Sequence, residues 1–222
     1  MALTKYNYNS FDITPVASKA LAFNSDADGF TTATEGDMVL IKTLTASSDS
    51  TLEFEDGTDD VVLDNTYPIY LFKFINIHPS GDGVRLQFQG NAAGGSGFNE
   101  TMTTTSFRAF HNEAGTDADL QYVTGTDQAQ GTGFQDITDY GGGSGGADEC
   151  ASGELWLFDP SSTTFIKHFM ASASTYLNSD YQSQKYHAGY FNTTSAIDEI
   201  QFKFDSGNID SGTIKLYGIK DS

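Results

Sequence analysis

The sequence predicts an all-β protein, folded as an antiparallel β-sandwich that resembles a jelly roll. Strand-forming aromatic residues are plentiful, with 17 Phe, 11 Tyr and 1 Trp. Turn-forming residues are equally frequent, including 23 Gly. Short runs of alternating apolar and polar residues recur between these turns, whereas apolar residues at helical spacing are nearly absent.

The alternating runs and the turns between them place the strands. Pro68 should stand at the start of one long strand, where no ladder donor is needed. The Asp56-Gly57 pair predicts a tight turn. Residues 172–187 are polar and rich in Tyr, and we interpret them as a loop. In chain order, the expected strands cover residues 38–45, 51–54, 60–63, 67–77, 84–88, 104–111, 120–123, 134–137, 154–158, 164–170, 187–191, 197–204 and 213–219.

Two segments, 72–86 and 202–219, share an order of residues. Each contains Phe-Lys-Phe, then Asn-Ile, then Ser-Gly, and finally a basic residue followed by Leu. We interpret both as long hairpins of one fold, with Gly207 and Gly212 at positive φ in the second. The residues of the second segment expected in the core are Phe202, Phe204, Ile214 and Leu216.

The chain is expected to divide into an N-terminal arm, residues 1–35, and one β-sandwich domain, residues 36–222. The arm is polar, with a short helix or strand at 17–23, and would attach to a partner. Gly-rich loops at 90–100 and 112–150 are too long to be simple connections, so we expect them to carry function or to cover a neighbouring subunit.

Charge and cysteine content exclude several classes of protein. A formal charge of -19 repels nucleic acid and anionic membranes, so neither is an expected partner. No apolar run is long enough to cross a membrane, and we see no signal-peptide pattern. The only cysteine, Cys150, rules out an intramolecular disulfide framework, and the acids beside it should raise its pKa. Stability should therefore come from packing or oligomerisation.

One segment has the residue spacing of a calcium loop. Asn24, Asp26 and Asp28 occupy positions 1, 3 and 5, Gly29 occupies position 6, and Glu35 occupies position 12. A strand follows where an EF-hand would have its exit helix, so a polar turn is the alternative to a Ca²⁺ site. We expect no other cofactor.

We find no catalytic constellation in the sequence. The adjacent acids Asp148-Glu149 and Asp198-Glu199 would point to opposite faces of a strand and cannot meet on one substrate. The Gly clusters at 94–97 and 141–146 lack the Lys-Ser/Thr ending of a phosphate-binding loop. The sequence therefore favours a protein that is not an enzyme.

Aromatic residues near the last strands suggest a carbohydrate site. Tyr176, Tyr181 and Tyr186 could stack on sugar rings while Asp180 accepts hydrogen bonds from hydroxyl groups. Contacts between subunits are the alternative use of these tyrosines. Trp156 lies in an apolar run, Glu-Leu-Trp-Leu-Phe, and core packing explains it equally well.

Several segments resemble structural proteins of marine tailed bacteriophages: Leu-Ile-Lys-Thr-Leu-Thr-Ala-Ser-Ser, Tyr-Pro-Ile-Tyr-Leu-Phe-Lys-Phe-Ile-Asn-Ile-His-Pro-Ser, Gly-Glu-Leu-Trp-Leu-Phe-Asp-Pro and Gly-Asn-Ile-Asp-Ser-Gly-Thr-Ile-Lys-Leu-Tyr-Gly-Ile-Lys. The resemblance covers most of residues 38–220 and consists of strand and turn signatures, so it transfers no functional residues. It implies a jelly-roll virion component, either a tail or head fibre or a capsid decoration protein, which forms homo-oligomers and favours a trimer.

The resemblance also implies where the protein works. We expect assembly in the bacterial host cytoplasm, attachment to other capsid or tail proteins through the N-terminal region, and a β domain that contacts subunits or the host surface. One alternative is a carbohydrate-binding module that recognises a host surface glycan. A polysaccharide depolymerase is a third hypothesis, but the chain lacks the β-helix repeat that such enzymes often have.

Overall fold

The computed structural model describes residues 21–23, 30–32, 36–139, 148–177 and 180–221. The chain divides into two compact units, Met1–Asp37 and Met38–Ser222. In the first unit, β1 (Leu21–Phe23) pairs with β2 (Phe30–Thr32) in an antiparallel ribbon. A strand rather than a helix therefore occupies 21–23.

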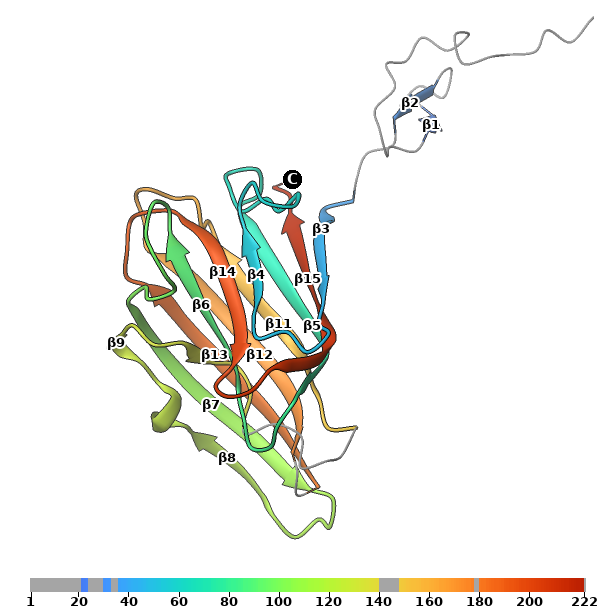
Figure 1. Ribbon diagram of the computed structural model, residues 1–222, viewed down its shortest axis with the longest axis vertical. Helices are drawn as coiled ribbons and strands as arrows, with labels where there is room; N and C mark the ends of the chain where they lie inside the picture. The colour runs from blue at the N-terminus through green and yellow to red at the C-terminus, as the bar shows by residue number, and fades with distance from the viewer. Residues whose placement is uncertain (1–20, 24–29, 33–35, 140–147, 178–179, 222) are drawn as a thin grey trace, which may run out of the picture. The chain divides into compact units, whose positions relative to one another are not determined.

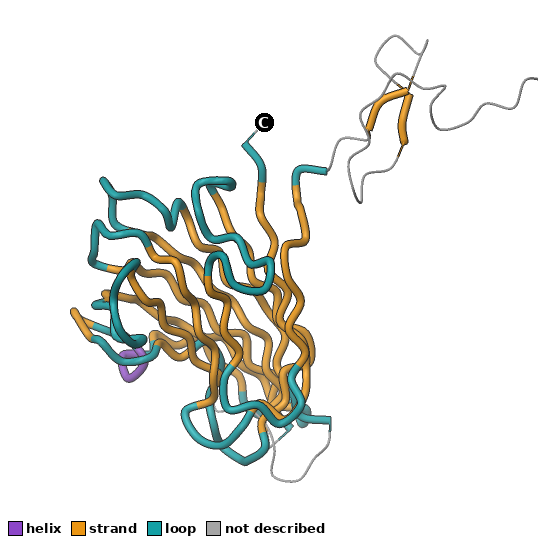
Figure 2. The backbone as a smooth tube through the Cα atoms, turned by 45° about the horizontal axis from the view of Figure 1, so that its top comes forward, coloured by secondary structure: helices purple, strands orange, loops and turns teal. Residues whose placement is uncertain are grey.

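The second unit is a sandwich of two antiparallel sheets (Figures 1 and 2), which confirms the predicted all-β fold. The small sheet has the order β10-β6-β14-β4, and the large sheet has the order β3-β15-β5-β11-β12-β13-β7-β8, with β9 paired to β7. The jelly-roll connection remains a prediction. The strands are β3 (Met38–Thr45), β4 (Leu52–Glu55), β5 (Ile69–Pro79), β6 (Leu86–Ala92), β7 (Met102–Asn112), β8 (Ala118–Tyr122), β9 (Ala129–Gly131), β10 (Gln135–Asp136), β11 (Ala151–Phe158), β12 (Lys167–Leu177), β13 (Tyr181–Phe191), β14 (Ile197–Phe204) and β15 (Ile209–Ile219).

Phenylalanine rings from both sheets form the centre of the core. Phe202 on β14 lies 5.3 Å, between ring centroids, from both Phe72 and Phe74 on β5. Phe88 on β6 meets Phe169 on β12 at 5.0 Å in an edge-to-face pair. The four predicted core residues are confirmed as buried: Phe202, Phe204, Ile214 and Leu216.

The prediction that 72–86 and 202–219 form hairpins is wrong. The chain leaves the large sheet after β5 and enters the small sheet at β6, and it returns from β14 to β15. The two segments pair with each other instead, because β5 lies beside β15 and β6 beside β14. Period-two alternation reports which side chains face the core, but it does not report which sheet a strand joins.

The two glycines singled out in the second segment have the predicted positive φ, but one of them lies within a strand and not in a turn. Gly207 (φ 74°) and Gly212 (φ 113°) both have positive φ. Gly207 lies in the connection between the sheets, whereas Gly212 lies inside β15, where the register with β5 shifts. A Cβ atom at Gly212 would stand 2.5 Å from the Asn76 carbonyl oxygen, so this bulge requires glycine.

Two further expectations are corrected. Residues 60–63 form no strand, and instead the Asp56 carboxylate accepts a hydrogen bond from the Leu63 N–H at 2.8 Å and holds a turn. Residues 172–187 are not a loop, because β12 and β13 form a long hairpin there. Its inward positions in this range include Ala173, Thr175, Ser183, Lys185 and His187, so the segment lacks the apolar alternation by which a half-buried strand is identified. Residues 154–158 and 164–170, which the sequence predicts as strands, lie in β11 and β12 and pair with each other in a hairpin.

Candidate functional site

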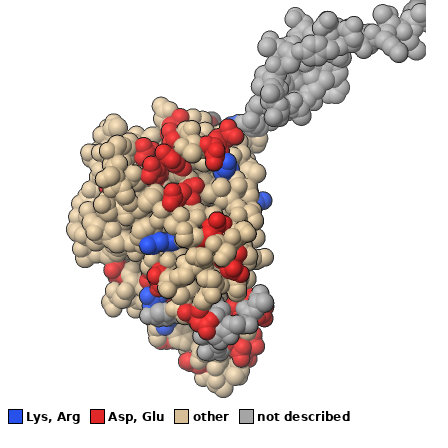
Figure 3. Space-filling model, viewed as in Figure 1, with Lys and Arg blue, Asp and Glu red and all other residues tan. Residues whose placement is uncertain are grey.

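The outward surfaces of the two sheets differ in chemistry. An antiparallel sheet in a sandwich usually points apolar residues inward and polar residues outward. The small sheet follows this rule, with Glu53 and Glu55 on β4 beside Gln201 and Glu199 on β14. Figure 3, which views the small-sheet side, shows many acidic side chains there. The large sheet breaks the rule, and we call its outward surface the outer face.

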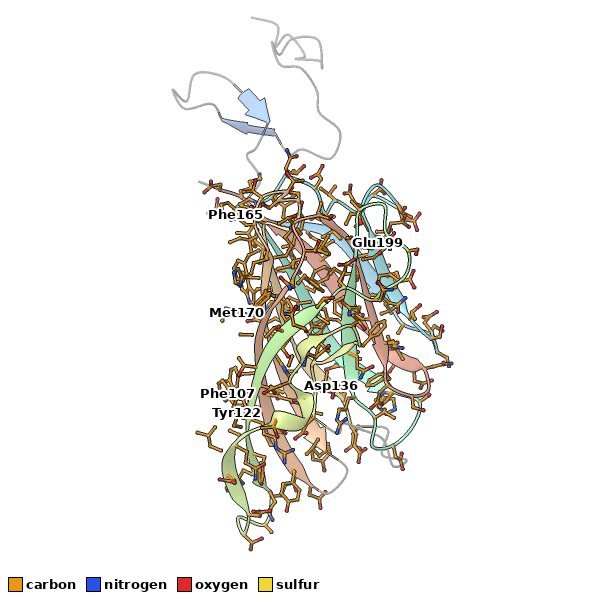
Figure 4. All side chains as sticks on the ribbon, turned by 90° about the vertical axis from the view of Figure 1, so that its left-hand side faces the viewer. Phe107, Tyr122, Asp136, Phe165, Met170 and Glu199 are labelled. Atoms are coloured by element: carbon orange, nitrogen blue, oxygen red, sulfur yellow. The ribbon has the colours of Figure 1, made fainter. Side chains whose placement is uncertain are left out.

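Exposed apolar side chains are concentrated on the outer face. Nine large hydrophobic residues are exposed in the described part of the chain, and all but Phe165, which lies in the β11–β12 loop, stand on this surface. Figure 4 shows Met170, Phe107 and Tyr122 along one side of the molecule and Glu199 toward the other. The eight residues are Met38, Leu40, Ile75, Phe107, Leu120, Tyr122, Met170 and Tyr186.

Strand register arranges the outer face in rows that cross the sheet, because residues opposite each other on neighbouring strands lie side by side. The apolar row contains Leu40, Tyr217, Leu71, Trp156, Met170, Ala188 and Thr105. The mixed row beside it contains Lys215, Lys73, Glu154, Ser172, Tyr186, Phe107 and Tyr122. The flanking row, on the other side of the apolar row, contains Met38, Ile219, Ile69, Phe158, His168, Tyr190 and Thr103.

The β12–β13–β7 half of the outer face is hollowed. One depression of about 320 Å³ is lined by Trp156, Met170, Tyr186 and Phe107 among others. A second of about 520 Å³ lies beside it, and both include Ala188 in their walls. Small outward side chains in this half leave space above the sheet, whereas the outward side chains of the opposite half are large.

Charged groups in the apolar and mixed rows of the outer face are few: Glu154, Lys73 and Lys215. The Glu154 carboxylate accepts hydrogen bonds from the Trp156 indole N–H and from the Lys73 ammonium group, each at 3.0 Å. Together these donors, Trp156 first, lower the pKa of Glu154. The rings of Phe107 and Tyr186 stack at 4.9 Å with an interplanar angle of 16°. Aromatic surface, one oriented carboxylate and two ammonium groups are therefore the chemistry that these two rows offer.

The structure does not bring the four predicted carbohydrate residues together. Tyr176 donates a hydrogen bond to Asp180 at 3.0 Å, and this bond raises the pKa of Tyr176 to about 12. Tyr181 donates to Asp117 at 2.9 Å and follows the inward alternation of β13, whereas Tyr186 points outward. Tyr186 stands opposite Ser172, four residues or about 13 Å along β12 from Tyr176. Only Tyr186 belongs to the outer face aromatic group.

The predicted calcium ligands Asn24, Asp26, Asp28 and Glu35 lie outside the described residues. Within the described ranges, no three His, Cys, Asp or Glu side chains gather as a metal-binding group. None of the described helical structure is long and apolar enough to span a membrane.

Sequence reasoning missed a buried polar cluster between the sheets. The Lys185 ammonium group donates to the Thr138 carbonyl at 3.1 Å, and Asp139 pairs with Arg108 while accepting from the Ser183 hydroxyl at 3.1 Å. Burial lowers the pKa of Lys185 to about 8. Inward residues of β13 supply much of this cluster, and a correct strand assignment for 181–191 would have indicated it. Because its groups are enclosed, we interpret the cluster as structural.

Cys150 is confirmed as a thiol with a raised pKa. Burial is the main cause, and the nearby Asp148 carboxylate adds to it. A thiol of this kind is a poor nucleophile at neutral pH.

Comparison of this chain with known protein families, with curated proteins and with solved structures finds no match. The resemblance to marine phage proteins therefore remains a prediction, and function has to be argued from the outer face.

Proposed function

We propose that this chain is a non-enzymatic structural protein of a tailed-phage virion, either a fibre or a capsid decoration protein, and that its outer face mediates assembly. It would be made in the bacterial cytoplasm and attached to the particle through the N-terminal unit. The sequence resemblance and the exposed apolar side chains of the outer face support this proposal.

One observation carries the assembly role: the large sheet exposes large apolar side chains on its outward surface in addition to those it buries in the core. Met170, 55% exposed, and Leu120, 70% exposed, both stand on this surface. Monomeric soluble proteins rarely expose large contiguous apolar patches, whereas permanent interfaces resemble a domain core cut in half. A sheet of this composition is expected to be covered by protein in the working state.

Labelling of phage particles tests the virion role. Antibodies raised against this chain should decorate purified particles of a phage that encodes it, at regular positions. A phage that carries Met170→Glu should incorporate less of the chain, and deletion of residues 1–37 should abolish incorporation. Phe165→Glu is the matched control, because Phe165 is exposed but lies off the outer face. Particles that never contain the chain would refute the proposal.

A second candidate function is recognition of a neutral glycan. The stacked pair of Phe107 and Tyr186 borders the same depression as Trp156 and Glu154, and aromatic faces beside a carboxylate suit sugar rings. The acidic protein would repel anionic polysaccharides. A glycan array should then give hits that Trp156→Ala and Tyr186→Ala remove and Tyr176→Ala leaves unchanged. An array without hits would dismiss this candidate.

A further inference from the structure

We propose that the outer face of the large sheet binds the outer face of a second copy of this chain, related by a two-fold axis. The inference rests on the proposed assembly role of this face and names its partner. Three properties of the described residues lead to it: the area of the apolar rows, the local charge, and a match between the two halves of the sheet.

The area of the outer face is close to that required for a stable dimer. Strands about 4.8 Å apart make the eight consecutive strands of the large sheet about 34 Å wide. Three rows spaced by two residues, about 6.7 Å each, cover about 20 Å along the strands. The product, about 700 Å², approaches the roughly 800 Å² that each partner buries in a standard interface.

The charge of the outer face also favours a second copy. The chain has a net charge of -19, so most contacts between copies would bring acidic surfaces together. In its apolar and mixed rows the outer face has one acid, Glu154, and two lysines, Lys73 and Lys215. Face-to-face pairing therefore avoids the repulsion that association through the small sheet would produce.

The mixed row is self-complementary under a two-fold axis. The middle of the eight strands lies between β11 and β12. An axis along the strands at this position places β5 over β13 of the second copy, and β15 over its β7. Lys73 then meets Tyr186 of the second copy, and Lys215 meets its Phe107, so each ammonium group lies on an aromatic face.

These contacts would also relieve a like-charge pair. Lys73 and Lys215 stand opposite each other on neighbouring strands, an arrangement that is unfavourable in isolation. Glu154 pairs with Lys73, and no described residue forms an ion pair or hydrogen bond with the Lys215 ammonium group. An aromatic ring from the second copy would supply Lys215 with a partner.

The apolar row matches in shape under the same axis. Tyr217 comes to lie over Thr105 of the second copy, Leu71 over its Ala188, and Trp156 over its Met170. Large side chains of one half thus meet small side chains of the other. The depressions of about 320 Å³ and 520 Å³ in the β12–β13–β7 half provide the space for this match.

Light scattering during gel filtration tests the pairing on the full chain. The wild type should run with twice the mass of the 23.9 kDa chain. Met170→Glu places two carboxylates at the centre of the interface. It should raise the Kd of the dimer about 30-fold or more. Phe165→Glu, the off-face control, should remain dimeric. Circular dichroism of each variant establishes that it is folded.

A cross-link tests the symmetry even if Met170→Glu fails to fold. Lys73→Cys and Tyr186→Cys, combined with Cys150→Ser, should be joined into a covalent dimer by a bismaleimide whose span matches the distance of about 10 Å between face-to-face sheets. Within one chain, β5 and β13 are three strand spacings apart, about 14 Å, so a link between residues 73 and 186 of the same chain would need a longer reagent. Either new cysteine alone should give no cross-link, because residues 73 and 186 each lie far from their own counterpart in the second copy.

Each outcome has a definite meaning. A monomeric wild type, a trimer, or a dimer without the cross-link would overturn two-fold pairing of the outer faces. If the wild type is monomeric but Met170→Glu still blocks incorporation into particles, the assembly role stands and the partner is a different protein. If the chain is dimeric and cross-links but is absent from particles, the pairing stands and the virion role fails.

Discussion

His187 should make the sandwich lose stability as the pH falls through the range just below neutrality. It lies on the inner side of β13, only 3% exposed, with the Gln135 side-chain amide nitrogen 3.2 Å from its Nδ1 atom. Burial, reinforced by the positive charge of Lys185, lowers the pKa of His187 to about 3, against 6.5 for an ordinary histidine. The nearby Asp139 opposes this shift only in part.

The sign and size of the effect follow from proton linkage. Between pH 6.5 and pH 3 the unfolded chain binds a proton at this position and the folded chain does not, so acid favours unfolding. The contribution is absent well above pH 6.5 and grows by about 1.4 kcal/mol for each pH unit below it. Between pH 7 and pH 5, His187 should therefore remove about 2 kcal/mol from the free energy of unfolding.

Urea unfolding at pH 7 and pH 5, at one protein concentration, measures this loss. From pH 7 to pH 5, the free energy of unfolding of His187→Gln should fall by about 2 kcal/mol less than that of the wild type. Comparison of the two proteins cancels the titration of the carboxylates that they share. His111→Gln, which replaces an exposed histidine outside the three rows, should behave like the wild type. Equal pH dependence of wild type and His187→Gln would refute the argument.

Three further substitutions test the packing, each by urea unfolding at pH 7. Phe202→Ala removes a ring that contacts Phe72 and Phe74 across the sandwich, and it should lower the free energy of unfolding by about 3–5 kcal/mol; a loss below about 1 kcal/mol would contradict the central position of this ring. Gly212→Ala should cost about 1–3 kcal/mol, because its φ of 113° and the adjacent backbone leave no room for a Cβ atom, and an unchanged stability would contradict this reasoning. Lys185→Met removes an ammonium group whose charged form burial disfavours, so it should leave the free energy of unfolding unchanged or raise it by up to about 3 kcal/mol, and a clear destabilisation would show that the hydrogen bond to Thr138 and the attraction of Asp139 outweigh the cost of burial.

Much of the architecture could be predicted from the sequence. Alternation identified the strands around Phe72, Trp156 and Phe202, and the pattern at 202–219 identified four core residues and both positive-φ glycines. The connections were not predictable in this way, because a strand that leaves one sheet for the other has the same alternation as a hairpin strand.

The candidate site was harder to predict for a different reason. Tyr186 was selected from the sequence, but its neighbours Phe107, Trp156 and Met170 come from three other strands, and only register places them together. The strands that were missed, in 172–187, place polar or small residues such as Ser183, Lys185 and His187 on their inward side, so the apolar alternation that marks a half-buried strand is absent there. A site built across strands is therefore a property of the assembled sheet rather than of any motif.

The order of strands in the large sheet has a consequence for how the protein is made. The C-terminal strand β15 lies between β3 and β5, and Ile219 pairs with both Met38 and Ile69. Until residues 209–219 have left the ribosome, the gap between β3 and β5 cannot be filled, and Phe72 lacks its lateral neighbour Leu216. Pairing between such distant parts of the chain slows folding. The sandwich should therefore close late, only after β15 has been synthesised, and shorter nascent chains would leave the edges of β3 and β5 open to aggregation.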